Sequence, residues 1–409
     1  MTMSSDYKKK AFQLIIFFGL ISLFGDIVYE GARSVNGPYL KTLGVSAAVV
    51  GFIAGLGEFI GYAIRMVSGY FADKTKAYWV FTFLGYGMLV SVPLLSLTGV
   101  WQVAALFIIM ERLGKALRAP ARDTIVSQAS KQIGTGLGFA ISEVMDQIGA
   151  LTGPLILSGL FLVVGASGNE IAKYQRGYSL FWIPFILVMA CVTFAFIKVP
   201  NPEKLEMVIK KAPEPDKLSK TFCFYTVFSF ITTMGFVNFA LIGYHFKAKN
   251  VLTDAQIPLF YAVAMAVDGV AAWFIGTHYD RLKKRSNNEK AGLGALLMIP
   301  LFSVFIPVFA FSMNFTFALI SAVIWGVVMG IHETIMKSAI ADLTPMKKRG
   351  TGYGLFNAAY GLAMFIGSAL MGVLYDYSIA ALIGFAVFLQ ILAIPVFFMM
   401  KREILRQVV

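Results

Sequence analysis

The sequence predicts an all-α polytopic membrane protein in which twelve transmembrane helices form two six-helix halves. Hydrophobic residues make up 58% of its 409 residues and charged residues only 14%, whereas an ordinary soluble protein carries about 25% charged residues. The hydrophobic residues fall in long runs, unlike the short alternating segments of a membrane β-barrel. Because a bilayer offers the backbone no hydrogen-bond partners, such runs cross it as helices. This composition excludes a soluble enzyme, a disordered chain and a disulfide-rich scaffold.

The apolar runs come in two groups of six. The first group covers residues 12–39, 46–72, 78–98, 101–120, 135–165 and 176–198. The second group covers residues 220–246, 256–277, 291–312, 314–337, 351–375 and 379–400. Most runs reach the roughly 20 residues that a helix needs to cross a bilayer. A charged, proline-containing stretch separates the groups. We therefore expect a first six-helix bundle at 1–198, a cytoplasmic linker at 199–219 and a second bundle at 220–409.

The basic residues predict the orientation of these spans. With the N-terminus inside, 25 of the 35 Lys and Arg residues fall on the inner side, 5 in outer loops and 5 within the spans. Cytoplasmic loops of membrane proteins carry such an excess of positive charge. Both termini are therefore expected in the cytoplasm. The net charge of +13 indicates basic loops, not a nucleic-acid-binding surface.

Two short patterns recur in both groups of spans. Gly69–Lys74 reads G-x-x-x-D-K at the end of the second run, and Gly276–Arg281 reads G-x-x-x-D-R at the end of the eighth. A glycine followed at a fixed interval by G-x-G-x-G occurs at Gly114 and 134–138, and again at Gly330 and 350–354. Patterns at equivalent places indicate a duplicated six-helix unit, which is one of the architectures of transporters.

With these patterns the sequence resembles the prokaryotic major facilitator superfamily (MFS) over nearly the whole chain. That family's loop motif reads G-x-x-x-D-[RK]-x-G-[RK]-[RK]. The first copy here keeps Gly69, Asp73 and Lys74, with Lys76 in the place of the second glycine. The second copy keeps Gly276, Asp280, Arg281 and the basic pair Lys284 and Arg285. The resemblance implies the MFS fold and solute transport by alternating access, with no cofactor and no enzymatic reaction.

The fifth run carries a second motif of this family. Gly149-x-x-x-Gly153-Pro154 is similar to the MFS antiporter motif, although Leu157 and Ser158 replace the glycine pair that follows it. The resemblance also implies that spans one and four line the central cavity, and that spans two and five lie where the halves meet. The antiporter motif favours export of a solute in exchange for protons.

Eight charged residues of the first half form the expected proton and substrate site. A charge at the centre of a bilayer costs about 3 kcal/mol on insertion scales, so each needs a functional or structural reason. Asp26, Glu30 and Arg33 share one helical face, at spacings of four and three residues. The other members are Glu58, Glu111, Arg112, Glu143 and Asp146. Carboxylates without a full charge partner can bind and release protons, whereas static ion pairs would only orient helices.

The repeated loop motifs form the expected gate on the cytoplasmic side. By the resemblance, Asp73 and Asp280 latch this side by pairing with basic residues and helix ends. The other gate residues are Gly69, Lys74, Gly276 and Arg281 of the motifs, and Arg118, Arg122 and Asp123 at the end of span four. The alternative is that these residues are ordinary charges of a cytoplasmic loop.

The sequence therefore favours a secondary active transporter that moves a small organic solute by alternating access with proton coupling. Efflux of a cationic or polar solute by antiport is favoured, because the first half holds more acids than bases. Import of an organic anion bound by Arg33 and Arg112 is one alternative, and a non-transporting membrane sensor is another. We expect a monomer in the cytoplasmic (inner) membrane whose partners are the solute, protons and lipid. Nucleic acid is not an expected partner, and no metal ion is expected because no intramembrane Cys/His/Asp cluster is evident.

Overall fold

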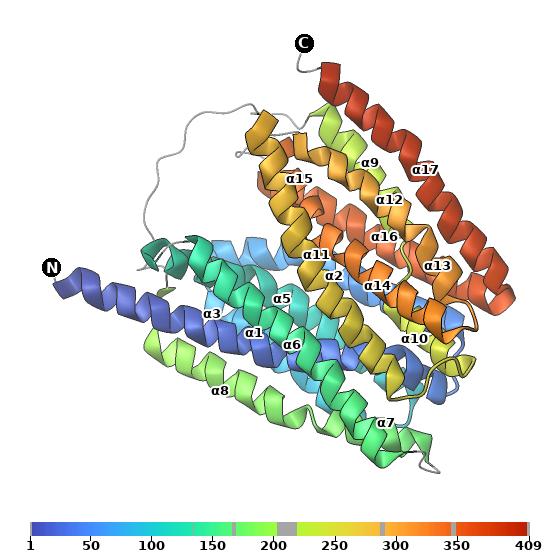
Figure 1. The fold of residues 1–409 in the computed structure, drawn as a ribbon. Helices are drawn as coiled ribbons and strands as arrows, with labels where there is room; N and C mark the ends of the chain where they lie inside the picture. Colours follow the sequence, from blue (N-terminus) through green and yellow to red (C-terminus); the bar gives the residue numbers. More distant parts are fainter. Residues whose placement is uncertain are drawn as a thin grey trace. The chain divides into compact units, whose positions relative to one another are not determined.

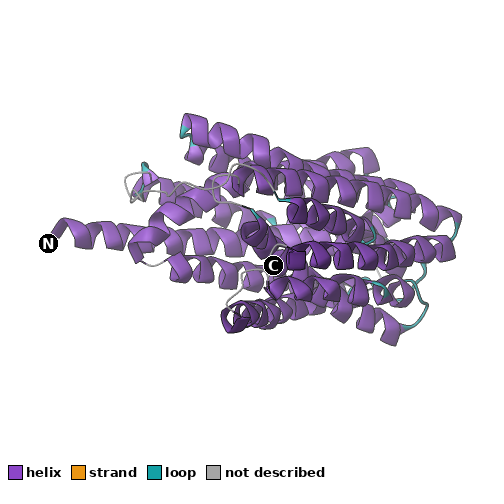
Figure 2. Cartoon of the chain, turned by 90° about the horizontal axis from the view of Figure 1, so that it is seen from above, coloured by secondary structure: helices purple, strands orange, loops and turns teal. Residues whose placement is uncertain are grey.

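The computed structural model of this chain is built from helices and short loops. The residues described are 2–133, 135–165, 169–202, 219–286, 291–344 and 349–406. Figure 2 shows no strand among these residues. The all-α class is thus confirmed for this part of the chain. Most of the predicted linker lies outside the described residues, as does Gly134 of the repeated glycine pattern.

Residues before the linker form helices α1 to α8 (Figure 1). The longer ones are α1 (Thr2–Thr42), α2 (Ala47–Thr75), α5 (Trp101–Ile133) and α6 (Thr135–Val164). The predicted third span is a series of shorter pieces, namely α3 (Tyr78–Gly87), η1 (Met88–Val90), α4 (Ser91–Leu94) and η2 (Leu95–Leu97). The sixth span combines α7 (Glu170–Ser179) and α8 (Trp182–Lys198).

Residues after the linker form the remaining helices. They are α9 (Lys220–Met234), α10 (Phe239–Ala248), α11 (Gln256–Ser286), η4 (Ala291–Leu297), α12 (Met298–Ser303), α13 (Phe305–Ala310), α14 (Phe315–Ile331), α15 (Lys337–Leu343), α16 (Arg349–Tyr377) and α17 (Ile379–Arg406). A π-helical turn, η5 (His332–Met336), joins α14 to α15. The seventh span is broken between α9 and α10, where the side chain of Asn238 accepts a hydrogen bond from the backbone N–H of Ala240 at 2.9 Å and caps α10.

Eleven helical segments among the described residues are long and apolar enough to cross a membrane. Helix α5, the predicted fourth span, is not one of them, although its 33 residues exceed the length required. It carries Glu111, Arg112, Lys115 and Arg118 within about two turns. The fourth span is therefore the one in which polar contacts must compensate for the lost hydrophobicity.

Contacts within the chain define two compact units. The first contains residues 1–43 and 60–211, and the second contains residues 44–59 and 212–409. Helix α2 thus contributes its first part to the second unit and its last part to the first. In the first unit α1 packs against α5, α6 and α8, and in the second α11 packs against α14 while α9 packs against α16 and α17.

The glycines of the antiporter-like motif bring α1 and α6 together. A Cβ atom added to Gly149 would lie 2.9 Å from the Cβ of Asp26, and one added to Gly153 would lie 2.8 Å from the backbone nitrogen of Gly31. Side chains at these positions would force the helices apart. Small residues commonly permit such close approach between membrane helices.

Helix α5 is also held close to its neighbours by glycines. A Cβ atom at Gly114 would lie 2.7 Å from the carbonyl oxygen of Gly85 on α3. A Cβ atom at Gly69 on α2 would lie 3.3 Å from the Cβ of Pro120. The charged part of α5 is thereby packed between helices of the same unit and removed from lipid.

In the second unit, the first part of α2 packs on α16. A Cβ atom at Gly55 would lie 2.9 Å from the backbone of Phe365. The carboxylate of Asp376, at the end of α16, accepts hydrogen bonds from the backbone N–H groups of Ala47 at 3.1 Å and Ala48 at 2.8 Å. The first turn of α2 is therefore capped by a side chain from α16, since the first N–H groups of a helix lack partners within it.

Candidate solute and proton site

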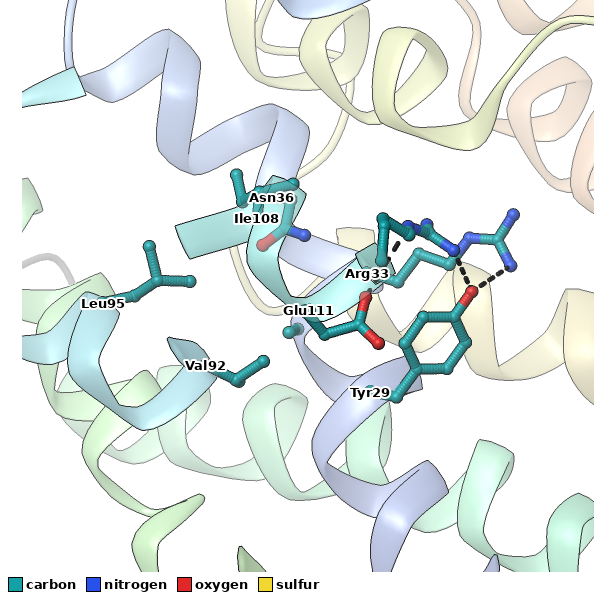
Figure 3. A pocket seen from close by; sticks show the side chains of 9 residues that line it. Tyr29, Arg33, Asn36, Val92, Leu95, Ile108 and Glu111 are labelled. Atoms are coloured by element: carbon teal, nitrogen blue, oxygen red, sulfur yellow. Dashed lines mark hydrogen bonds and ion pairs between the residues drawn. The ribbon is translucent and has the colours of Figure 1, made fainter. Parts of the chain in front are cut away.

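Three cationic side chains of the first unit converge on Tyr29. Arg33, one turn further along α1, donates a hydrogen bond from Nη1 to the Tyr29 hydroxyl oxygen at 3.4 Å. Arg112 on α5 donates a hydrogen bond from Nη1 to the same oxygen. The ammonium nitrogen of Lys115 lies 3.7 Å from the centroid of the Tyr29 ring, in cation–π contact. Figure 3 shows the Tyr29 hydroxyl with these two hydrogen bonds.

Two carboxylates balance part of this positive charge. Arg33 Nη1 lies 3.7 Å from Oε1 of Glu30. The two oxygens of Glu111 lie 3.6 Å from Arg112 Nε and 3.6 Å from Arg118 Nη2. All of these side chains are largely buried, and a buried charge is tolerated only with a partner. Glu111 therefore lies between two arginines, its chain neighbour Arg112 and Arg118 two turns further along α5.

A small pocket lies between these charges and an apolar wall. Its polar lining comes from Tyr29, Arg33, Asn36, Glu111 and Arg112. Its apolar lining comes from Ala32, Val92, Leu95 and Ile108. The side chains converge from α1, from the third span and from α5 (Figure 3). The cavity volume is about 10 Å³, which is room for about one water molecule.

Arg118 belongs to this charge cluster through its ion pair with Glu111 and lies outside the pocket lining. It is 5% exposed, and besides Glu111 it contacts the carbonyl oxygen of Gly85 at 3.3 Å and the ring of Tyr86 at 5.0 Å. The sequence placed Arg118 in the cytoplasmic gate because it follows the apolar part of span four. In this conformation its partners are instead buried groups of α3 and α5.

A second charge cluster joins α1, α5 and α6. Arg122 Nη1 lies 3.9 Å from Oδ2 of Asp146 and 3.4 Å from the hydroxyl oxygen of Ser22, while Nε lies 3.0 Å from Oδ1 of Asp123. Asp26, one turn after Ser22 on α1, has Asp146 and Arg122 among its charged neighbours. Among the described residues the Asp26 carboxylate has neither a hydrogen bond nor an ion pair. It faces α6 where Gly149 allows the two helices to approach.

Two of the eight predicted site residues have other surroundings. Glu143 is exposed on α6. Glu58 belongs to the second unit, and its side chain is buried. The six remaining residues fall in the two clusters described above. The same-face spacing of Asp26, Glu30 and Arg33 thus predicted members of both clusters, but not the tyrosine that organises the first.

The predicted gate residues in the last turn of α2 contact aromatic side chains. The hydroxyl of Tyr78 donates a hydrogen bond to Oδ1 of Asp73 at 3.1 Å, and the ammonium nitrogen of Lys74 lies 5.7 Å from the ring centroid of Tyr70. Within the described residues Asp73 makes no ion pair in this conformation. Its pairing with Arg118 or Arg122 therefore remains a prediction for another state of the protein.

The second copy of the gate motif lies at the end of α11. Asp280 and Arg281 are exposed there, and a Cβ atom at Gly276 would meet nothing within 4 Å. The neighbouring Lys283 contacts Asp342 of α15 instead. No sequence pattern singles out Asp342, because a lone acid at the end of a span resembles an ordinary loop charge.

Comparisons with known proteins agree with this architecture. Residues 14–368 match the Major Facilitator Superfamily. An uncharacterized protein of Mycobacterium tuberculosis is 36% identical over 397 residues, which cover 96% of this chain and 93% of that protein. The chain belongs to the major facilitator superfamily. The resemblance seen in its motifs is confirmed, and with it the all-α MFS fold of a multi-pass membrane protein.

Several proteins that are similar to this chain are transporters. An uncharacterized MFS-type transporter of Methanocaldococcus jannaschii is 24% identical over 380 residues, covering 89% of each chain. The fold of the present chain is similar to that of a bacterial homologue of the human lysosomal transporter Spinster. The TM-score is 0.70 at 13% identity, and the match covers 96% of this chain and 97% of that chain. The nucleoside transporter NupG gives a TM-score of 0.66 at 13% identity, covering 96% of this chain and 99% of that chain. The family indicates a transporter and not an enzyme.

Proposed function

We propose that this protein is a proton-coupled secondary active transporter that exports a small organic solute by alternating access. The observation that supports proton coupling is the Asp26 carboxylate. It lies on α1 near Asp146 and Arg122 and has no hydrogen bond or ion pair among the described residues. Its charged neighbours are the acids Asp146 and Glu30 and the bases Lys115 and Arg122. Three acids thus lie near two bases, an arrangement that proton binding would relieve, and intramembrane acids commonly form proton relays in transporters.

Proton binding at Asp26 would act on the contact between α1 and α6. The carboxylate adjoins Gly149, and Asp146 lies one turn earlier on α6 at 3.9 Å from Arg122. When Asp26 is neutral, Arg122 still pairs with Asp146 and Asp123. The net charge at the α1–α6 contact therefore changes by one with each proton bound. A ligand or proton shifts a two-state equilibrium only if it interacts differently with the two states. The α1–α6 contact supplies a place where that difference can arise.

The direction of transport is supported by the antiporter-like motif. Gly149 and Gly153 pack directly against α1 beside Asp26, so the motif and the proposed proton site are one structure. We therefore propose antiport, with protons entering as solute leaves. Import of an organic anion is the second candidate function, favoured by the pairing of Arg33 and Arg112 on Tyr29.

The remaining parts of the proposal concern the membrane and the gate. We place the protein as a monomer in the cytoplasmic membrane, with both termini inside and with six-helix bundles at 1–198 and 220–409. The excess of basic residues on the inner side supports this orientation. Asp73 and Asp280 would latch the cytoplasmic side in the state that closes it.

Proton flux in proteoliposomes tests the proposed coupling. Candidate solutes are added to vesicles that contain a pH-sensitive dye, and the solute-driven proton flux is compared between the wild type and Asp26→Asn. We expect Asp26→Asn and Asp146→Asn to lose most of this flux while the protein remains folded. Glu170→Gln, a change at an exposed residue of α7, serves as the control and should transport normally. Wild-type flux with unchanged pH dependence in both aspartate variants would exclude this coupling site.

A further inference from the structure

We propose that Arg33 and Arg112, together with Tyr29, bind an anionic group of the transported solute, a carboxylate or a phosphate. This inference rests on the proposed transport function and concerns only the charge of the solute. It differs from the cationic or polar solute that the acid-rich composition of the first half favours. The arrangement of the charges, and not their number in the sequence, carries it.

The first observation is the position of the Tyr29 hydroxyl oxygen. It accepts hydrogen bonds from Nη1 of Arg33 at 3.4 Å and from Nη1 of Arg112 (Figure 3). A guanidinium group recognises carboxylate and phosphate oxygens with its fork of N–H donors. The phenolic oxygen thus occupies the place between two guanidinium groups in which an oxygen of an anionic solute would be bound.

The second observation is the local balance of charge. The cations in contact with Tyr29 or with the acids beside it are Arg33, Arg112, Lys115 and Arg118. Ion pairs join the arginines among these cations to the carboxylates of Glu30 and Glu111. In these contacts, all between described residues, four cations therefore meet two acids. Extending the group to the further charged neighbours of Lys115 adds Asp26 and Arg65, which leaves the excess unchanged.

Glu111 lines the pocket and would repel an anion if its charge were not compensated. One of its oxygens lies 3.6 Å from Arg118, an arginine outside the pocket lining. Arg118 is held in turn by the carbonyl oxygen of Gly85 at 3.3 Å. This second partner allows Arg112 to turn from Glu111 toward a bound anion without leaving an unpaired carboxylate. Leaving it unpaired would otherwise be strongly unfavourable.

The rest of the pocket indicates the shape of the solute. Val92, Leu95 and Ile108 form an apolar wall opposite the arginines, and Asn36 adds an amide. An amphiphilic anion, with an acidic group and an apolar body, matches this combination. The present cavity of about 10 Å³ is too small for such a body. The solute therefore binds in a conformation where the third span and α5 stand further apart, with its acidic group displacing the Tyr29 hydroxyl.

Four probes of similar size and different charge test the proposal. Purified protein in detergent is titrated with benzoate, phenyl phosphate, benzyl alcohol and benzylamine, and thermal unfolding is followed. A compound that binds the folded state raises its unfolding temperature. We expect benzoate or phenyl phosphate to raise it, and the stronger of the two identifies the acidic group. An equal or larger effect of benzylamine or benzyl alcohol, or no effect of any probe, would overturn the proposal.

Matched variants locate the binding. Arg33→Gln and Arg112→Gln should each bind the effective anion at least about tenfold more weakly, as expected for loss of one charged hydrogen-bond donor. Arg176→Gln, at an exposed arginine of the same unit, should bind like the wild type. If the glutamine variants do not fold, Arg33→Lys and Arg112→Lys retain the charge and should still bind about tenfold more weakly, because they lose the planar fork. Wild-type affinity in the folded variants would exclude this site, and a cationic solute that drives proton flux would then leave the transport proposal standing.

Discussion

Lys283 and Asp342 join α11 to α15 by a bidentate ion pair. The ammonium nitrogen of Lys283 lies 2.7 Å from Oδ1 and 2.8 Å from Oδ2 of Asp342. The hydroxyl of Tyr279 donates a further hydrogen bond to Oδ2 at 2.6 Å. Lys283 stands in the second copy of the loop motif, where the family has a glycine. This ion pair therefore ties the motif to the end of span ten in the present conformation.

Removing one partner of this ion pair should destabilise the second unit. Lys283→Met leaves Asp342 with Tyr279 as its remaining hydrogen-bond partner among the described residues, and we expect a loss of about 1–2 kcal/mol in unfolding free energy, typical of hydrogen bonds to charged groups. The double variant Lys283→Met/Asp342→Asn should lose less than the two single changes together, because the interaction is shared. Thermal unfolding of the four proteins measures the coupling. Strictly additive losses would show that the two side chains contribute independently.

The cap on α2 gives a second prediction. Asp376→Ala removes both acceptors for the N–H groups of Ala47 and Ala48, and loss of a cap typically costs about 0.5–2 kcal/mol. Asp376→Asn retains an acceptor oxygen without the charge that favours the helix N-terminus. We therefore expect thermal stability in the order wild type, Asp376→Asn, Asp376→Ala. An alanine variant as stable as the wild type would mean that water replaces the cap.

The fold could be predicted from the sequence because each membrane span is marked by an apolar run as long as the whole helix. Eleven of the expected spans have that signal in the described residues. Helix α5 does not, because four charged residues lie within about two of its turns. Its charges are compensated by Tyr29 and by Gly85, which lie 83 and 33 residues away from their partners. Such long-range partners cannot be found from helical spacing.

The candidate site was predicted only in part for the same reason. Spacing within a helix correctly placed Glu30 beside Arg33. It gave no signal for Tyr29, because a tyrosine inside an apolar run is indistinguishable from a packing residue. A count of acids against bases over the whole half describes its composition and not the charge around one pocket. Acids such as Glu143 are exposed elsewhere, so the total for the half differs from the charge around Tyr29.

The orientation can be tested by labelling single cysteines. Lys401→Cys near the end of α17 should react with a membrane-impermeant thiol reagent only after the cells are opened. Lys249→Cys in the loop after α10 should react on intact cells, because the basic-residue distribution places that loop outside. Both positions are exposed, so access to the reagent depends on the side of the membrane. The background variant replaces Cys191 and Cys223. Labelling of Lys401→Cys on intact cells would reverse the assignment.

The close approach of α1 and α6 gives the last prediction, and two glycines on α6 allow it to be controlled. Gly149→Ala places a methyl group within 2.9 Å of the Cβ of Asp26, so the helices must separate. Overpacking of this kind costs about 1–3 kcal/mol, which exceeds the gain of up to about 1 kcal/mol from replacing glycine by alanine in a helix. Gly159→Ala on the same helix meets nothing within 4 Å and should show only that gain. We expect Gly149→Ala to lower the unfolding temperature and to reduce solute-driven proton flux, while Gly159→Ala raises or preserves both. If the two variants behave alike, the α1–α6 contact does not require the glycine, and the link between the antiporter-like motif and Asp26 fails.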